Sequence, residues 1–148
     1  ACNPKKVNEA VKAFLECDEF LFGEVDRATA AVQQDGLALQ YAHEALKKDP
    51  DVVKAAVTQN GLALQYAHAD LKNYLALVLI AVESNGYALQ HAPEEFKKNS
   101  EVVKAAVRKN SGSFEYAHVD IKKNEEVVLC VVHLDGCALL YAHENMKN

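Results

Sequence analysis

The sequence predicts an all-α fold, a right-handed α-solenoid of five 25-residue helical repeats that follow an N-terminal capping helix. A segment of the type GLALQYAHEALKKD recurs at a constant step of 25 residues, and a segment of the type VVKAAV stands before most copies. Self-similarity at a fixed step marks repeat proteins, in which each unit buries its apolar columns against its neighbours. The predicted repeats are residues 24–48, 49–73, 74–98, 99–123 and 124–148, and together they form a single structural domain.

Each repeat is expected to begin with a capped helix of about ten residues. Asp49, Asn99 and Asn124 share one column just before the apolar segment, where a side-chain oxygen can accept from the first free amides of a helix. Pro50 then occupies the favoured first helical position. The helix is expected to end at the following Asn-Gly or Asp-Gly step, with the glycine in the left-handed conformation.

A second helix and a short third turn complete the unit. The second helix carries one apolar column, made of Leu39, Leu64, Leu89, Phe114 and Leu139, with tyrosine two places later in most copies. The short turn is centred on Leu46, Leu71, Phe96, Ile121 and Met146 and ends in lysines that suit the negative end of a helix. Helices this short are marginal in isolation, so packing between copies must stabilise them. Tetratricopeptide and ankyrin repeats have different lengths, and strand alternation, as in leucine-rich repeats, is absent.

The two ends of the chain differ. Residues 1–23 place Val7, Val11 and Phe14 at helical spacing and are expected to form a cap. No residue follows Asn148, although a terminal repeat needs a cap or a polar outer face, so the C-terminal repeat is expected to contact a partner. The chain starts at Ala1 without a methionine, which leaves a processed or a truncated N-terminus open.

Composition excludes several classes of function. The formal charge is −5 and the pI about 5.7, so no positive excess draws the chain to nucleic acid. The longest apolar run, Leu75 to Val82, is eight residues long, whereas a membrane-spanning helix needs roughly 20. The four cysteines lack C-x-x-C spacing, and the two in the repeats, Cys130 and Cys137, stand in columns of small or apolar residues. A soluble protein is expected, and its compartment stays open.

The motif N-G-x-A-L-Q-Y-A, followed by E-E-L-K-x-N and E-V-V-K-A-A-V, resembles the repeats of the family named domain of unknown function 4116. The resemblance covers residues 24–148. It implies tandem helical repeats, found in secreted effectors of intracellular bacteria and in large families of protists and algae, and it implies no catalytic residue. Where the family usually has serine after Y-A, this chain has a column of histidines with one proline, made of His43, His68, Pro93, His118 and His143.

Three columns could carry chemistry, and each is better explained by structure. Equivalent histidines on stacked helices lie about 10 Å apart, too far to share a zinc ion, so a local capping role is expected. Acidic neighbours neutralise the lysine column, made of Lys47, Lys72, Lys97, Lys122 and Lys147, which could otherwise follow a phosphate backbone. Core packing is expected for the tyrosine column, made of Tyr41, Tyr66, Tyr116 and Tyr141. No catalytic, cofactor-binding or metal-binding residue and no cofactor is predicted.

Apolar residues at outward positions interrupt the repeat pattern. Leucine replaces polar residues or proline at five such positions, Leu75, Leu79, Leu129, Leu134 and Leu140. Exposed apolar patches usually mark interaction sites, so these leucines are expected to be covered by another chain. The alternative is that uneven packing buries them among the repeats.

The function predicted from these features is a non-enzymatic scaffold or adaptor that binds a protein, such as an accessory subunit of a larger complex. One alternative is the targeting region of a secreted bacterial effector, or of a larger protein, whose enzymatic domain is absent here. A third hypothesis, ligand binding or catalysis at the histidine column, would require stoichiometric zinc in the purified protein.

Overall fold

In the computed structural model, residues 24–136 are described, and over this range the chain forms helices and no strands. One unit, an α-helix followed by a 3₁₀ helix and a one-turn α-helix, recurs along it. Its copies are α2 (Glu24–Gln34), η1 (Gly36–Tyr41) and α3 (Glu44–Lys47); α4 (Pro50–Gln59), η2 (Gly61–Tyr66) and α5 (Ala69–Lys72); α6 (Leu75–Ser84), η3 (Gly86–His91) and α7 (Glu94–Lys97); α8 (Ser100–Lys109), η4 (Ser111–Tyr116) and α9 (Val119–Lys122); and α10 (Glu125–Leu134). The predicted N-terminal cap, residues 1–23, and Leu140 lie outside the described residues.

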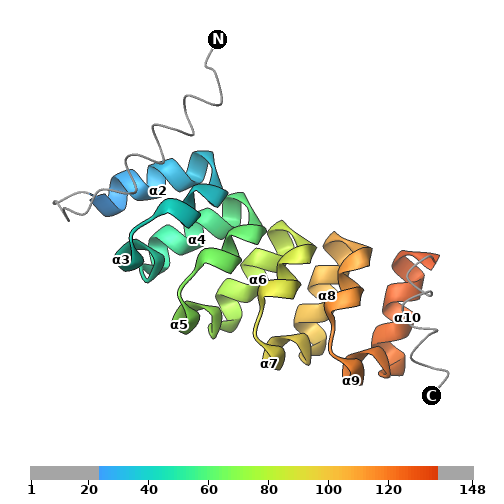
Figure 1. Cartoon of the computed structure of the whole chain (residues 1–148). Coiled ribbons are helices and arrows are strands. Elements are labelled where there is room, and N and C mark those ends of the chain that lie inside the picture. Colours follow the sequence, from blue (N-terminus) through green and yellow to red (C-terminus); the bar gives the residue numbers. More distant parts are fainter. Residues whose placement is uncertain (1–23, 137–148) are drawn as a thin grey trace, which may run out of the picture.

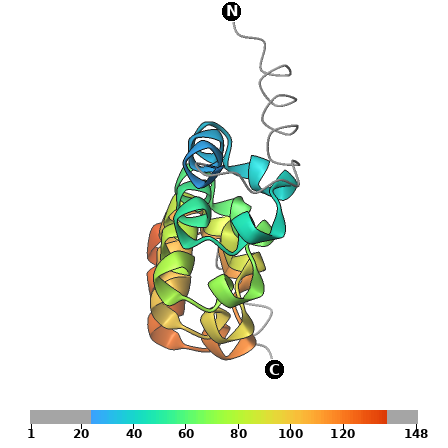
Figure 2. The ribbon, with the colours of Figure 1, turned by 90° about the vertical axis from the view of Figure 1, so that its left-hand side faces the viewer.

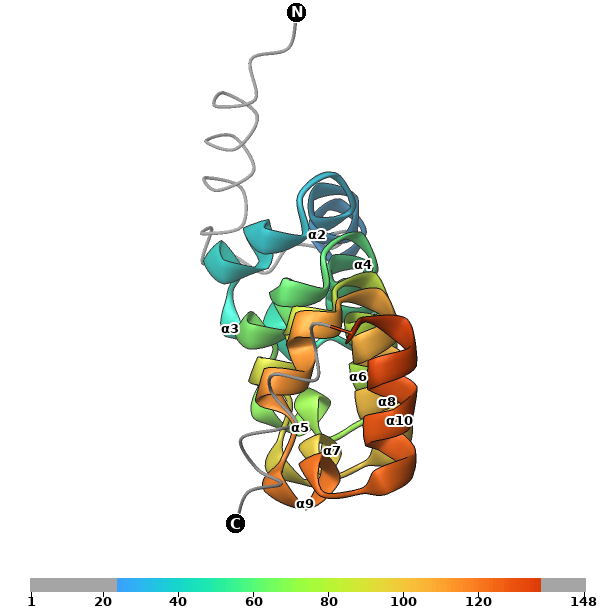
Figure 3. The ribbon, with the colours of Figure 1, turned by 90° about the vertical axis from the view of Figure 1, so that its right-hand side faces the viewer.

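The helices form two layers. The long helices α2, α4, α6, α8 and α10 stand side by side in chain order in one layer (Figure 1). The 3₁₀ helices and the short α-helices form the second layer, as the end-on views in Figures 2 and 3 show. Each of α4, α6 and α8 therefore packs against the long helix before it and the one after it, and α2 and α10 are the ends of the described row.

The predicted helix caps are confirmed. The Asp49 carboxylate accepts hydrogen bonds from the amides of Asp51 and Val52, at 3.0 and 3.1 Å. Asn99 caps α8 in the same way, and Asn124 caps α10 through one amide. Pro50 is the first residue of α4, as predicted. Each of Asp35, Asn60 and Asn85 accepts from the amide two residues on and so caps the 3₁₀ helix that follows it.

The core lies between the two layers and follows the predicted columns. Leu39, Leu64, Leu89 and Phe114 are completely buried. They stand on helices of the 3₁₀ type, in which residues three apart lie on one face. Gly36, Leu39 and Ala42 are spaced in this way and are all buried. The short turns contribute Leu46, Leu71, Phe96 and Ile121 to the same core.

The predicted left-handed conformation of the glycines is wrong. None of the described glycines has a left-handed φ, and α4 ends at Asn60 with extended backbone, φ −148° and ψ 110°. A Cβ atom at Gly36 or Gly61 would instead overlap the carbonyl oxygen of Ala56 or Ala81 in the next unit, and the same holds for Gly86 and Ala106. Glycine is required here because two backbones lie too close together for a side chain, and not because the turn needs a positive φ angle.

The amides of these glycines also link neighbouring units. Gly36 N donates to Gln59 Oε1 at 2.7 Å, and Gly86 N donates to Asn110 Oδ1 at 2.8 Å. In the fourth copy Ser111 replaces the glycine, and its hydroxyl donates to Asp135 Oδ2 at 2.6 Å. The junction between the fourth unit and α10 therefore uses a side-chain hydrogen bond in place of the close backbone approach.

Candidate functional site

The histidine column has a structural role. Nδ1 of His43, His68 and His118 accepts a hydrogen bond from the amide two residues on, at 3.2 to 3.3 Å, and so caps the following short helix. The backbone amides of His68 and His118 also donate to Lys47 and Lys97 of the preceding unit, both at 3.0 Å. The predicted capping role is thereby confirmed for these three residues, while His143 lies outside the described range. Over residues 24–136, no three His, Cys, Asp or Glu side chains are grouped as a metal ion would require.

The described lysines of the lysine column interact within their own units. Lys72 Nζ donates to the Gln65 carbonyl at 2.8 Å, and Lys122 Nζ donates to the Glu115 carbonyl at 2.7 Å, at the ends of 3₁₀ helices. Lys47 and Lys97 form ion pairs with the glutamate three residues earlier. Burial lowers the pKa of Lys72, and burial together with Lys72 and Lys97 lowers the pKa of His91 nearby. These lysines hold the fold together and do not form a free cationic track.

The tyrosine column is only partly in the core. Tyr66 and Tyr116 are half-buried and pack against the core, as predicted, whereas Tyr41 is exposed and Tyr141 lies outside the described residues. The Tyr116 ring stands edge to face with Tyr87, at 6.5 Å between ring centroids. A column with one exposed and two half-buried members does not form a continuous stacking platform.

The start of α6 lacks the side-chain cap that α4, α8 and α10 have. Tyr74 occupies the position of Asp49, Asn99 and Asn124, and no side chain accepts from the first amides of α6. Tyr74 is 62% exposed, and Leu75 beside it is 38% exposed. Losing a cap costs about 1 kcal/mol. An exposed aromatic residue at such a position is a deviation of the kind that accompanies function.

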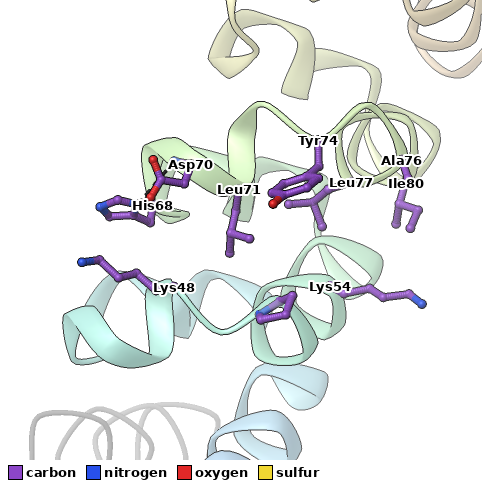
Figure 4. Close-up of a pocket in the computed structure, with 10 residues that line it drawn as sticks. Lys48, Lys54, His68, Asp70, Leu71, Tyr74, Ala76, Leu77 and Ile80 are labelled. Carbon is purple, nitrogen blue, oxygen red and sulfur yellow. Dashed lines mark hydrogen bonds and ion pairs between the residues drawn. The ribbon is translucent and has the colours of Figure 1, made fainter.

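A groove lies beside this uncapped helix start, between α4 and α6 and over the short helix α5 (Figure 4). Its volume is about 620 Å³, in the range of small-molecule and peptide pockets. Most of its lining is apolar, contributed by Pro50, Leu71, Tyr74, Ala76, Leu77 and Ile80. In Figure 4 the side chains of Leu71 and Leu77 and the Tyr74 ring lie along the α5 and α6 side, so the groove has an apolar wall.

Charged groups stand at both ends of this groove. Lys48, His68 and Asp70 gather at one end, and Lys54 extends from α4 at the other (Figure 4). Over residues 24–136, no carboxylate forms an ion pair with Lys48 or Lys54. The groove therefore combines an apolar wall with two lysines that have no carboxylate partner in the described part of the chain.

The predicted interface leucines fall into two places. Leu75 is exposed next to the groove, but Leu79 is partly buried and packs against the core, which fits the alternative of uneven packing. Leu129 and Leu134 are 62% and 50% exposed on α10, at the far end of the layer of long helices. Leu75 and the α10 pair are therefore too far apart in the row of helices to form one patch (Figure 1). The fifth residue, Leu140, lies outside the described residues.

The sequence reasoning missed Tyr74 and Ala76. Both signals were present, since Tyr74 stands in the column of cap residues and Ala76 stands in the column of Asp51, Glu101 and Glu126. An alignment of these two columns would have shown that the third unit lacks both its cap and its first-turn carboxylate. The groove itself could not be found in this way, because its walls come from two units.

Comparison with known proteins gives one match. The family model described as "Domain of unknown function (DUF4116)" matches residues 26–72 and 76–122, so the two matched segments begin 50 residues apart. No curated protein and no solved structure matches the chain. Within residues 24–136, each helix is too short or too polar to cross a membrane.

Proposed function

The chain belongs to the domain of unknown function 4116 family, and we propose that it is a non-enzymatic scaffold or adaptor that binds a protein, such as an accessory subunit of a larger complex. The single observation that carries this proposal is the start of α6, where Tyr74 and Leu75 are exposed and replace the pairs Asp49-Pro50, Asn99-Ser100 and Asn124-Glu125 of the second, fourth and fifth repeats. An exposed aromatic and aliphatic pair beside an apolar groove has the composition of a binding hot spot.

The proposal includes the form of the array, a right-handed α-solenoid of five 25-residue repeats. The 3₁₀ helices that begin at residues 36, 61, 86 and 111 support the 25-residue step. The two family matches begin 50 residues apart, which is twice that step. Each matched segment then corresponds to two neighbouring repeats, and α10 begins the fifth.

A second contact surface is proposed on α10. Leu129 and Leu134 are exposed there, and in the other repeats the column of Leu129 holds Thr29, Lys54, Leu79 and Lys104, and that of Leu134 holds only polar residues. Their side chains lie on a helix at the end of the layer, which supports end-on contact with a partner. The targeting region of a secreted effector or of a larger protein remains the alternative, and a full-length transcript that encodes further domains would favour it.

The test is native purification of the tagged chain from its own source, followed by cross-linking and identification of the complex. The double variants Tyr74→Ser with Leu75→Ser, and Leu129→Asp with Leu134→Asp, remove one surface each. Val119→Asp is the matched control, because Val119 is an exposed apolar residue on the short helix α9. We expect a defined complex that at least one double variant loses and the control keeps, with helix content unchanged. A chain that purifies alone, or a complex that survives both double variants, contradicts the proposal.

A further inference from the structure

The surroundings of Lys54, at one end of the groove, can be compared with those of the equivalent lysine in the fourth unit. In the column of Lys54, the fourth unit has Lys104, whose Nζ forms an ion pair with Glu126 of α10. This interaction lowers the pKa of Glu126 and so holds its side chain as a carboxylate. Fifty residues earlier in the chain, Lys54 stands at the position of Lys104, and Ala76 stands at the position of Glu126. Lys104 therefore has a glutamate partner on the next long helix, whereas the equivalent position next to Lys54 carries an alanine.

Three neighbouring changes at the start of α6 point in the same direction. The residues Asn124, Glu125 and Glu126 at the start of α10 correspond to Tyr74, Leu75 and Ala76 at the start of α6. A capping amide and two carboxylates are replaced by an aromatic ring and two aliphatic side chains. The result is an apolar edge on the groove, with Lys54 left at its end (Figure 4).

We propose that this groove binds an acidic, apolar peptide segment of the partner protein, whose carboxylate pairs with Lys54 as Glu126 pairs with Lys104. The inference rests on the proposed function and names the chemistry of its partner. Apolar side chains of the segment lie against Leu71, Tyr74 and Leu77, and the exposed ring of Tyr74 covers one side of the segment.

A peptide fits the groove better than a small carboxylate does. The apolar surface continues from Tyr74, which lines the groove, onto exposed Leu75 outside it, so a ligand enclosed within the groove would leave Leu75 uncovered. An extended or helical segment that enters the groove from α6 covers both. Its acidic residue also complements Lys54, at the end of the groove where no carboxylate lines it, whereas a basic residue would be repelled there.

The experiment is affinity selection from a display library of random dodecapeptides, followed by titration of the selected peptides by fluorescence anisotropy. Lys54→Gln removes the cation, and Ala76→Glu supplies the missing carboxylate from within the chain. A carboxylate in the first turn suits α6, as Asp51, Glu101 and Glu126 suit α4, α8 and α10, so folding is retained. Lys104→Gln is the matched control, because it removes the equivalent lysine at a junction that already has its glutamate.

We expect the selected peptides to carry Asp or Glu beside apolar residues. Their affinity should fall about 5-fold in Lys54→Gln, the size of one partly exposed ion pair, and by at least as much in Ala76→Glu. Lys104→Gln should bind like the wild type, and replacing the peptide's Glu by Gln should abolish the difference between Lys54 and Lys54→Gln.

Peptides without an acidic residue, equal binding to wild type and Lys54→Gln, or no selected peptide at all would each refute the inference. Laurate serves as the probe for a small apolar carboxylate. Binding of laurate in the groove without any peptide binding would refute the inference as well. A native complex that survives Lys54→Gln and Ala76→Glu but not Leu129→Asp with Leu134→Asp would refute only this inference. The proposed function fails separately, when the complex survives both double variants that test it.

Discussion

The uncapped start of α6 predicts that asparagine at position 74 stabilises the protein more than alanine does. In α4 one oxygen of Asp49 accepts from two amides, at 3.0 and 3.1 Å. An asparagine at position 74 would accept from the amides of Ala76 and Leu77 in the same way. Such a cap contributes about 1 kcal/mol. Tyr74→Asn and Tyr74→Ala both lose the aromatic ring, so their difference isolates the cap.

Urea unfolding followed by far-ultraviolet circular dichroism measures this difference. We expect Tyr74→Asn to exceed Tyr74→Ala by about 1 kcal/mol in free energy of unfolding, or about 4 °C in Tm. The reciprocal change Asn99→Ala, which removes an existing cap, should lower the stability by a similar amount. If the two Tyr74 variants are equally stable while Asn99→Ala loses stability as expected, a side-chain cap at position 74 does not stabilise α6, and the reasoning is refuted.

Three further predictions follow from the packing. Gly61→Ala should cost roughly 1–3 kcal/mol by urea unfolding, because the added Cβ overlaps the Ala81 carbonyl. Gly136→Ala should cost far less, because no atom of the described residues lies within 4 Å of the added Cβ. Ser113→Ala should raise the free energy of unfolding by about 1 kcal/mol, because the buried Ser113 hydroxyl has no hydrogen-bond partner in the described residues; a loss of stability would reveal one. The pKa of His91 is lowered in the folded protein, so the unfolded chain binds a proton at this histidine more readily. The contribution of His91 to the free energy of unfolding is therefore fully present above pH 6.5 and is lost as the pH falls below that value. His91→Tyr should reduce that loss, measured as urea midpoints on either side of pH 6.5, and an unchanged pH dependence would contradict it.

Aligning the repeats predicted much of the fold, because many of the features concerned depend only on residues close together in the chain. Asp49, Asn99 and Asn124 were identified as caps, since capping depends only on a side chain and the amides two or three residues on. The buried column of Leu39, Leu64, Leu89 and Phe114 was likewise visible in sequence. The 3₁₀ character of the second helix was not predicted, because six residues are too few to separate a period of 3.0 from one of 3.6.

Features that arise between units were harder to predict. The role of Gly61 depends on the Ala81 carbonyl, 20 residues further along the chain, and an Asn-Gly step looks the same when it forms a left-handed turn. Leu79 seemed to face outward like Lys54, yet it packs partly against the core, since apolar side chains bend toward buried neighbours where lysines extend into water. Leu75 could be selected from the sequence because it replaces Pro50, Ser100 and Glu125 of other repeats, whereas the groove beside it is formed by two units and could not.

The close backbone approach at Gly36, Gly61 and Gly86 has a consequence for how such a chain can change over evolution. The distance between neighbouring units is fixed there by main chain against main chain, so the outward side chains have no part in setting it. The apolar groove beside Lys54 and Ala76 lies at the junction where Gly61 approaches the Ala81 carbonyl, so the outward residues at that junction can change without moving the two backbones apart. The glycines that set the contact between units and the outward residues proposed to bind a partner are thereby separate, so the outward residues can change without disturbing that contact.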